Sequence, residues 1–345
     1  MPRPTVNDIA REAGVSLATV DRVLNDRPGV KARTVSAVQE AISRLGYVRD
    51  IAAANLARQR SYRLVAALPD SDSQFVETLA AALRDAARTA AMARTELQIL
   101  RYPAEDPHRL AALLDALPPA ETSGVALMAP ETPVLRDAIK SLRGKGIPVI
   151  AIGSDLPNTD RDHFVGIDSR AAGRTAGVLM GRFVGRGPGQ IVVLAQSMQL
   201  RDAIERRHGF DAVMQAEFPD LEVLPTLETH GSDATLRAVV TERLRHAPGL
   251  RGLYVMGSGH RALASTLADL GLTGRFVIIG HELTPHTRRA LLAGQIDAVI
   301  TQNLGHLARS ALRVLRAKVD HAPIDAAQEQ LRIEILIREN LTSDQ

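Results

Sequence analysis

Polar side chains follow several short apolar runs in this 345-residue sequence. These residues are Asp70, Gln74 and Phe75 after residues 63–68, Glu131 after residues 124–128, and Asp155 after residues 148–152. Carboxylates and amides offer paired hydrogen-bond donors and acceptors, and a phenyl ring offers an apolar face, which together suit a polyol. Phe75 is equally compatible with a place in the core. The spacing predicts a small-molecule site if the runs are parallel strands, because ligands bind where such strands end.

No residue pattern indicates catalysis, a resident metal or a cofactor. His281, Glu282 and His286 read HELTPH rather than HExxH, so the two histidines do not share the helical face that zinc requires. The glycine-rich residues 185–189 lack the Lys-Ser/Thr pair of a phosphate-binding loop, and Ser197 has no nucleophile-elbow context. The chain contains no cysteine, which excludes disulfides and thiol chemistry. We therefore expect a binding protein rather than an enzyme.

The charge of the chain is concentrated at its N-terminal end. Residues 1–63 carry eleven Lys/Arg and six Asp/Glu, whereas the other 282 residues carry 31 and 33. This basic segment favours binding to a polyanion, although a solvated surface has the same composition. No apolar run approaches the ~20 residues of a membrane helix, and the chain does not start with an apolar signal core. We expect a cytoplasmic protein without membrane contact.

The basic segment has the pattern of three short helices. The expected caps are Thr5 with Asp8, Gly14 and Ser16 around the first two helices, and Thr34 and Gly46 at the ends of the third. The expected core residues are Val20, Val23 and Leu24 of the second helix and Val35, Val38, Ile42 and Leu45 of the third. Two short helices joined by Gly-Val-Ser are typical of a helix-turn-helix.

The first 60 residues, with the segment TVNDIAREAGVSLATVDRVLN, resemble the N-terminal domain of the lactose-repressor (LacI/GalR) family of transcription regulators. In that family the second helix enters the major groove of DNA. The resemblance implies base reading by Leu17, Ala18 and Arg22, and phosphate contacts by Thr5, Ser16, Thr19, Asn25 and Thr34. Arg22 can donate two parallel hydrogen bonds to guanine. Asp21 stands where the family usually has Ser, and it either accepts a hydrogen bond from cytosine N4 or repels phosphate.

The segment IAAANLARQR that follows is expected to be the family's hinge helix, which orders on DNA. By resemblance, Leu56 wedges into the minor groove together with its counterpart from a second subunit, and Ala53 and Asn55 flank the groove. The alternative is a plain linker in which Leu56 packs locally. The expected organisation is a helix-turn-helix domain at 1–47, a hinge at 48–61 and an effector domain at 62–345.

From residue 62 onward, apolar runs alternate with amphipathic helical patterns, which predicts an α/β fold with parallel sheets. The expected strands are residues 63–68, 97–100, 124–128, 148–152, 190–194, 221–225, 252–256, 276–280 and 297–301. Gly153, Gly166 and Gly280 are expected to end or punctuate strands. The segments VGIDSRAAGRTAG (165–177) and RRHGF (206–210) resemble the two-lobed type I periplasmic-binding-protein fold. The expected lobes are about 62–160 with 290–322, and 161–289 with 323–341.

The same resemblance implies further ligand-binding residues in the cleft between the lobes. Arg206 occupies the family's ligand-binding arginine position, Glu282 and Gln302 follow late strands, and Ser258 replaces a frequent Asn. GHELTPHTRRALLAG resembles a sugar-type branch of these regulators. The implied protein is a DNA-binding regulator, a repressor above all, that binds a pseudo-palindromic operator as a homodimer and is released by a sugar, sugar acid or polyol. The alternatives are an activator or corepressor-type regulator that senses another metabolite, and a non-regulatory sugar-binding protein.

Overall fold

A computed structural model describes residues 4–24, 28–47, 61–71, 73–90 and 94–341 of the chain. The chain forms two compact units, Met1–Arg60 and Ser61–Gln345, which are called the head and the body below. Each unit has its own apolar core, and each is described by itself.

Within its described residues the head contains three helices: α1 (Val6–Ala13), α2 (Leu17–Leu24) and α3 (Ala32–Leu45). The expected capping box at the start of α1 is confirmed, because Asp8 N donates to Thr5 Oγ1 and Thr5 N donates to Asp8 Oδ2. Ser16 Oγ accepts from Thr19 N at the start of α2. Gly14 and Gly46 end α1 and α3 in the left-handed conformation, as glycine at this position allows.

The predicted start of α3 at Thr34 is wrong. The helix begins at Ala32, after Lys31 as the N-cap residue, and Lys31 makes no side-chain capping bond. Ala and Arg are strong helix formers, so the helix extends back past Thr34 without a side-chain cap. The buried core of the head consists of Ile9, Ala10, Val20, Val38 and Ala41. Val35 is only half-buried and lies outside this cluster.

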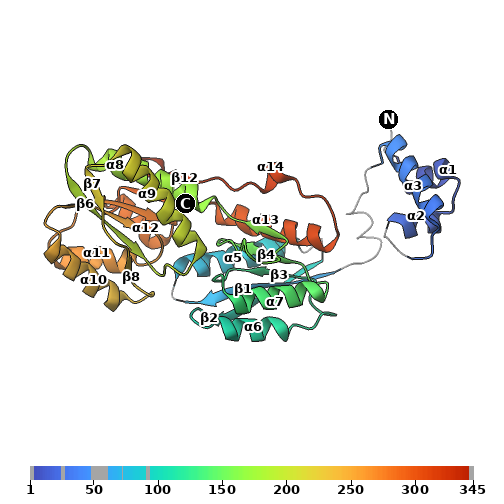
Figure 1. The fold of residues 1–345 in the computed structure, drawn as a ribbon, viewed down its shortest axis with the longest axis horizontal. Helices are drawn as coiled ribbons and strands as arrows, with labels where there is room; N and C mark the ends of the chain where they lie inside the picture. Colours follow the sequence, from blue (N-terminus) through green and yellow to red (C-terminus); the bar gives the residue numbers. More distant parts are fainter. Residues whose placement is uncertain (1–3, 25–27, 48–60, 72, 91–93, 342–345) are drawn as a thin grey trace. The chain divides into compact units, whose positions relative to one another are not determined.

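The first lobe of the body is built on a five-stranded parallel sheet with the order β2-β1-β3-β4-β5 (Figure 1). Its strands are β1 (Tyr62–Asp70), β2 (Thr95–Pro103), β3 (Gly124–Leu127), β4 (Val149–Ile152) and β5 (His163–Val165), and its helices are α5 (Gln74–Thr89), α6 (Pro107–Asp115) and α7 (Pro133–Gly144). Leu64 and Ala66 of β1 pack toward α5, whereas Val65 and Ala67 pack toward α6 and α7. Helices on both faces bury the strands, which is why the strands are continuous apolar runs.

The second lobe is built on a sheet with the order β12-β11-β10-β9-β6-β7, and β8 pairs with β6. Its strands are β6 (Gly189–Ala195), β7 (Leu221–Val223), β8 (Leu227–Glu228), β9 (Leu250–Val255), β10 (Val277–His281), β11 (Ala298–Thr301) and β12 (Glu334–Leu336), of which β12 runs antiparallel to β11. Its helices are α8 (Ser169–Val184) and α9 (Arg201–Glu217) on one face, and α10 (Asp233–His246), α11 (His260–Asp269) and α12 (Pro285–Leu292) on the other.

The chain crosses between the lobes three times (Figure 1). It passes from β5 to α8, from β11 to α13 (Leu304–Val319), and from α14 (Ala326–Glu329) to β12. Helix α13 packs against α5 and strands β3 to β5 of the first lobe. The predicted lobe boundaries at 160 and 290 are therefore wrong. β5 belongs to the first sheet and β11 to the second. Pairing with strands from distant parts of the chain decides which sheet a strand joins, and a local apolar run does not show that pairing.

Candidate functional site

A cavity of about 630 Å³ lies between the two lobes, within the size range of small-molecule sites. The first lobe contributes Gln74, Phe75, Tyr102, Met128 and Ser154 among others, and the second contributes Gln196, Arg206, Ser258, Glu282 and Gln302. These polar residues reach the cavity from strand ends, from the loops that follow them, or from the first two turns of the next helix, as Gln74 of α5 and Arg206 of α9 do. The site is therefore placed where an open α/β sheet binds its ligand.

Arg206 of α9 lies at the buried end of this cavity with only 4% of its surface exposed. Its Nη1 donates to the carbonyl of Met256 over 2.7 Å, and its Nη2 donates to Glu282 Oε1 over 3.2 Å. Asp202 Oδ2, one turn earlier on α9, lies 3.5 Å from Nη1. The carboxylates of Asp202 and Glu282 raise the pKa of Arg206 against the opposing effect of its burial. The guanidinium is thus held as a fixed, compensated cation.

Glu282 is held in the left-handed conformation, with φ of 67°, directly after β10. Its N–H donates to the carbonyl of Ile300 over 2.8 Å, and its own carbonyl accepts from Thr287 Oγ1 over 2.9 Å. These bonds fix a backbone conformation that non-glycine residues adopt mainly where the surrounding structure enforces it, often at functional sites. Burial raises the pKa of Glu282 to about 7, although the neighbouring Arg206 lowers it.

Several buried polar atoms of the lining residues have no hydrogen-bond partner among the residues that the structure describes. They are Arg206 Nε, Glu282 Oε2, Gln302 Oε1, Gln74 Oε1, Ser154 Oγ, His260 Nε2 and His281 Nδ1. Unmade hydrogen bonds of buried groups cost about 1–3 kcal/mol each, so such atoms are uncommon away from ligand sites. Gln302 is oriented by the bond that its Nε2 donates to Glu282 Oε1 over 3.4 Å. The cluster is arranged to exchange hydrogen bonds with a polar ligand.

The close packing of α8 on α9 places Arg206 in the cavity. A Cβ atom on Gly173 of α8 would lie 2.0 Å from the carbonyl oxygen of Arg206, and one on Gly209 would lie 2.1 Å from the carbonyl oxygen of Arg170. Both positions therefore require glycine for this close helix contact. Further along α9, the Phe210 ring stacks on Tyr254 at 4.5 Å between centroids. The segments 165–177 and 206–210, which are distinctive in sequence, contact each other here. Their contact holds α9, and with it Arg206, in place beside the cavity.

Gly280 does not end its strand, contrary to the sequence prediction. β10 continues to His281, and a Cβ atom on Gly280 would lie 2.2 Å from His260 Nε2. Gly280 therefore provides space for the imidazole of His260, a residue that lines the cavity. Burial lowers the pKa of His260 to about 4, so this ring is neutral at physiological pH. Gly153, by contrast, follows β4 with φ of 72°, as its predicted turn requires.

Six of the nine ligand-binding residues predicted from the sequence line the cavity: Gln74, Phe75, Arg206, Ser258, Glu282 and Gln302. Ser258 Oγ donates to Gln196 Oε1 over 3.1 Å. Asp70 and Glu131 are not among the lining residues, although their chain neighbours are.

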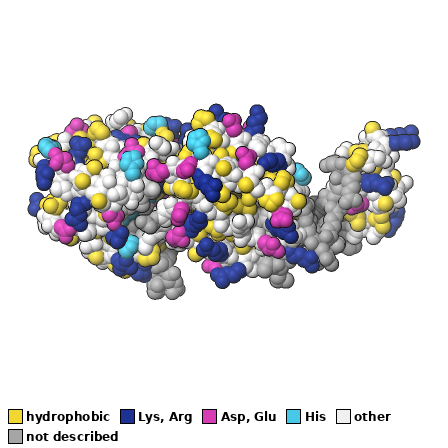
Figure 2. All heavy atoms as spheres, turned by 90° about the horizontal axis from the view of Figure 1, so that it is seen from below, with side chains coloured by type: hydrophobic (Ala, Val, Ile, Leu, Met, Phe, Trp, Pro, Cys, Tyr) yellow, Lys and Arg dark blue, Asp and Glu magenta, His cyan; other side chains and the backbone are white. Residues whose placement is uncertain are grey.

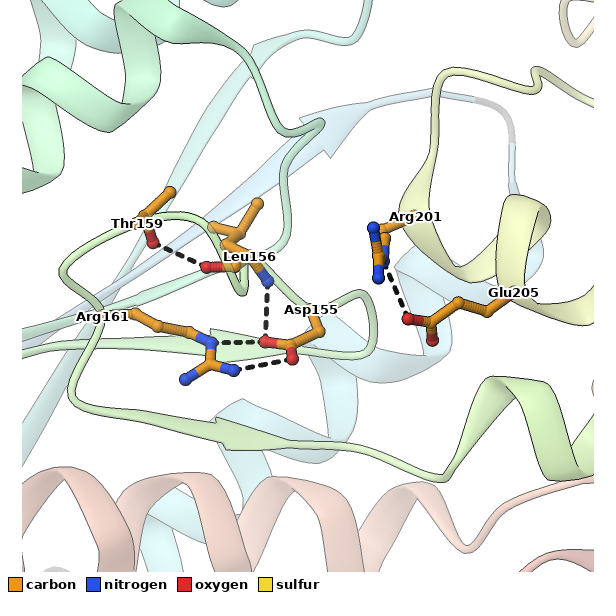
Figure 3. Close-up of polar contacts among 6 residues, drawn as sticks. All are labelled: Asp155, Leu156, Thr159, Arg161, Arg201 and Glu205. Carbon is orange, nitrogen blue, oxygen red and sulfur yellow. Dashed lines mark hydrogen bonds and ion pairs between the residues drawn. The ribbon is translucent and has the colours of Figure 1, made fainter.

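Asp155 also lies outside the lining, because its carboxylate is held by Arg161 and by the N–H of Leu156 (Figure 3). This pair belongs to the loop between β4 and β5. The Thr159 hydroxyl donates to the Leu156 carbonyl over 2.8 Å and closes the same loop. Asp155 therefore stabilises the loop instead of facing the cavity.

Sequence reasoning missed several lining residues, among them Tyr102, Met128, Gln196, Asp202 and His281. Tyr102, Met128 and Gln196 lie at or directly after the ends of β2, β3 and β6, so the strand-end criterion would have found them. Asp202 lies one helical turn before Arg206 at a spacing that predicts an ion pair, which is the signal for it. His281 was considered only as a metal ligand.

The head places the predicted base-reading residues of α2 on its outer face. Leu17 is 49% exposed, Ala18 and Arg22 are exposed, and Asp21 is half-buried, whereas Val20 is buried on the opposite face. The Ser16 and Thr19 hydroxyls lie 2.9 Å apart at the start of the helix. The predicted contacts Asn25, Asn55 and Leu56, together with Ala53, lie outside the described residues.

Fold and site together define a two-lobed α/β binding domain joined to a small helix-turn-helix head. Residues 64–323 match the periplasmic binding protein domain family, and the chain belongs to that family. Residues 5–50 match the family of bacterial regulatory proteins named lacI, so the expected resemblance of the head is confirmed.

Relatives of both parts are known. Catabolite control protein A of Priestia megaterium is 30% identical over 168 residues, which cover 49% of this chain and 48% of that protein. The HTH-type transcriptional regulator RegA of Clostridium saccharobutylicum is 48% identical over 71 residues, or 21% of each chain. The chain thus spans about half the length, or less, of these curated relatives.

Solved structures share the fold of the body. GanP, a glucose-galactose binding protein from Geobacillus stearothermophilus, superposes with a TM-score of 0.73 at 18% identity, covering 82% of this chain and 99% of that one. A solute binding protein from Burkholderia graminis in complex with D-arabinose gives 0.73 at 22% identity, covering 82% and 98%. Within the described residues, none of the helices is both long and apolar enough to span a bilayer.

Proposed function

We propose that this chain is a cytoplasmic, non-enzymatic transcription regulator that binds operator DNA through its head and a small effector in its cleft. The proposal rests on two features found in one chain. The outer face of α2 exposes Leu17, Ala18 and Arg22, and the cleft contains buried polar atoms without a hydrogen-bond partner among the described residues. The lacI-type head and the regulator relatives support it. A binding protein without regulatory function has no use for the head.

Base reading is assigned to the outer face of α2. The exposed Arg22 can donate two parallel hydrogen bonds to a guanine, which discriminates that base by ~1–3 kcal/mol. Leu17 and Ala18 offer only apolar contacts, for which a thymine methyl group is the natural partner. Asp21 accepts a hydrogen bond from cytosine N4 in this proposal.

Phosphate contacts are assigned to four hydroxyl-bearing residues and one amide, Asn25, of the head. The proposed set is Thr5, Ser16, Thr19, Asn25 and Thr34. Hydroxyl groups and helix N-termini suit phosphate oxygens, and such contacts set the register of the protein on the duplex without reading sequence. The Ser16 and Thr19 hydroxyls lie 2.9 Å apart, so one of them donates to the other and the second hydroxyl proton remains available for a phosphate oxygen.

The proposed operator is a pseudo-palindrome, because one short reading helix per head requires a homodimer to bind two half-sites. Asn55 and Leu56 of the proposed hinge contact the minor groove between these half-sites. Insertion of Leu56 and its partner's counterpart would kink the operator. Ligand binding then acts by changing the relative position of the lobes, and with them the spacing of the paired hinges.

The effector is proposed to be a sugar, sugar acid or polyol. The buried cluster of Arg206, Glu282 and Gln302 supports this class, because it combines donors and acceptors in a cavity that apolar side chains such as Phe75 and Met128 also line. The solved relatives of the same fold named as binding glucose, galactose or D-arabinose support it too. The segment at 280–294 supports the sugar-type branch of the family.

The regulator is proposed to act as a repressor that the effector releases. Release requires the effector to bind the DNA-free form better than the DNA-bound form, and the opposite preference would make it a corepressor. Activation of transcription by the same architecture is the alternative. Transcription measured with and without effector distinguishes these modes.

Selection of random duplexes by the immobilised full-length chain tests the proposal directly. We expect enrichment of a pseudo-palindromic sequence by the wild type. The Arg22→Ala variant should enrich a related sequence with one base pair relaxed in each half-site. Failure of the wild type to enrich any sequence above the input library would refute the regulator and favour a non-regulatory sugar-binding protein.

A further inference from the structure

Carboxylates outnumber cationic side chains around the cavity. Among its described lining residues, Arg206 and Arg261 are the guanidinium groups. The carboxylates are those of Glu105, Asp202, Asp233 and Glu282. Elsewhere on the body, acidic and basic side chains are interspersed on the face drawn in Figure 2. The cavity lining is thus more acidic than that face.

Each lining arginine already has a carboxylate partner in the protein. Arg206 is paired with Asp202 and Glu282 as described above, and Arg261 Nη2 lies 2.6 Å from Asp233 Oδ2. Arg201, one turn before Arg206, donates to Glu205 over 2.8 Å and does not line the cavity (Figure 3). An anionic ligand would therefore meet no uncompensated guanidinium among the described lining residues.

Three of the four lining histidines, His260, His281 and His286, do not supply positive charge to the cavity. Burial is the leading cause of a lowered pKa at His260, His281 and His286, and nearby arginines lower the pKa of the latter two further. These rings are therefore neutral near pH 7. They act as single donors or acceptors rather than as cations.

The hydrogen bond between His281 and Tyr254 decides whether the free ring nitrogen of His281 is a donor or an acceptor. Tyr254 OH lies 2.8 Å from His281 Nε2, and both residues are fully buried. If Tyr254 donates, its proton is satisfied and His281 carries its proton on Nδ1, an atom that has no partner among the described residues. The opposite arrangement would leave both the phenol proton and Nδ1 unsatisfied. His281 therefore contributes an N–H donor to the cluster around the cavity.

The unpaired atoms match hydroxyl groups better than carboxylate or phosphate oxygens. Gln302 Oε1 and Gln74 Oε1 are acceptors, whereas Arg206 Nε and His281 Nδ1 are donors. Glu282 Oε2 accepts when the carboxyl is ionised and donates when it is protonated. A hydroxyl both donates and accepts, so it satisfies either kind of atom. An ionised acid or phosphate only accepts, so beside the acceptors it would be left unpaired and repelled.

From this geometry we infer that the cavity takes an uncharged polyhydroxylated ligand, a neutral sugar or polyol, and rejects sugar acids and sugar phosphates. The inference rests on the proposed function, because it assumes that this cavity is the effector site, and it narrows the effector class. Phe75 and Met128, which also line the cavity, offer apolar contacts for the C–H groups of such a ligand.

Isothermal titration of the full-length chain with matched ligands tests the inference. The probes are five- and six-carbon aldoses and alditols, the aldonates of the same aldoses, and their phosphate esters. We expect at least one neutral probe to bind, and its aldonate and phosphate ester to bind at least tenfold more weakly. Tighter binding of an aldonate or phosphate ester than of its neutral parent would overturn the inference and leave the proposed regulator standing.

Binding of none of the probes would overturn both this inference and the proposed sugar effector. DNA selection with the same preparation tests the head independently of that result. The two failures are therefore distinguishable.

Two matched variants test whether the lining charge sets the preference. Asp233→Asn removes the carboxylate partner of Arg261 at the cavity. The control Asp269→Asn removes the carboxylate that lies 2.6 Å from Arg237 Nη1, and neither residue of that pair lines the cavity. For Asp233→Asn we expect the affinity ratio of phosphate ester to parent sugar to rise about two- to fivefold at low ionic strength. Asp269→Asn should leave that ratio unchanged. Equal ratios in both variants would overturn the charge argument.

Discussion

The buried carboxyl of Glu282 should make the stability of the body depend on pH, and Glu282→Gln should remove that dependence. Only 7% of Glu282 is exposed, and its burial raises the pKa from the ordinary 4.5 to about 7. The carboxyl is therefore neutral in the folded protein at pH 5 and must ionise inside the protein at pH 8.5. Glutamine is neutral at both pH values and similar in shape.

The sign follows from linkage between protonation and folding. A group whose pKa is raised by folding contributes stability below its unfolded pKa, here 4.5, and that contribution is lost as the pH rises through about 7. The rise in the pKa of Glu282 corresponds to about 3 kcal/mol of unfolding free energy, because each pKa unit is worth roughly 1.4 kcal/mol. The entropy of unfolding of the Ser61–Gln345 unit is about 0.6 kcal/mol per kelvin. The loss of about 3 kcal/mol therefore lowers the Tm by about 5 °C.

Differential scanning calorimetry of the full-length chain at pH 5.0 and pH 8.5 measures this effect. The Tm of Glu282→Gln minus that of the wild type should be about 5 °C larger at pH 8.5 than at pH 5.0. The exposed Glu121 provides a control, and Glu121→Gln should show the same difference at both pH values. A constant or decreasing difference for Glu282→Gln would refute the reasoning and mean that Arg206 keeps the carboxylate ionised throughout.

Three further outcomes are expected. Arg22→Ala should relax operator specificity at one base pair per half-site by ~1–3 kcal/mol, measured by fluorescence anisotropy on single-base operator variants, and a uniform loss would mean a phosphate contact only. Gly173→Ala should destabilise the body by about 1–3 kcal/mol or more in thermal unfolding, because its Cβ would overlap the Arg206 carbonyl, whereas Gly144→Ala has open space and should not; equal effects would contradict the packing argument. Leu56→Ala should reduce operator bending in gel-shift phasing assays, and unchanged bending would disprove the wedge.

Much of the sheet architecture is predictable because buried parallel strands read as short apolar runs. Every predicted run overlaps a strand of the structure. The missed strands β5, β8 and β12 are two or three residues long and include charged or polar residues, so no local pattern distinguishes them from loops. Which sheet a strand joins depends on pairing between distant segments, and for that reason β11 was assigned to the wrong lobe.

The site was predictable in part, for related reasons. Gln74, Glu282 and Gln302 follow strands and reach the cavity, as parallel strand ends predict. Asp155 follows a strand in the same way, yet Arg161 six residues later binds its carboxylate and holds it in the loop. A strand-end rule locates a residue near the cleft, but the path of the loop decides where its side chain points. The role of Gly280 was hidden because the imidazole that needs its space lies on a different element.

The central claim is that occupation of the cleft controls the affinity of the head for DNA. Fluorescence anisotropy of a labelled operator, obtained by selection with the full-length chain, measures that coupling when the strongest ligand from the titration panel is added. The account predicts that saturating ligand weakens operator binding by at least tenfold, and that Gln302→Ala shifts this response to higher ligand concentration. Operator binding that is unchanged at saturating ligand would contradict it.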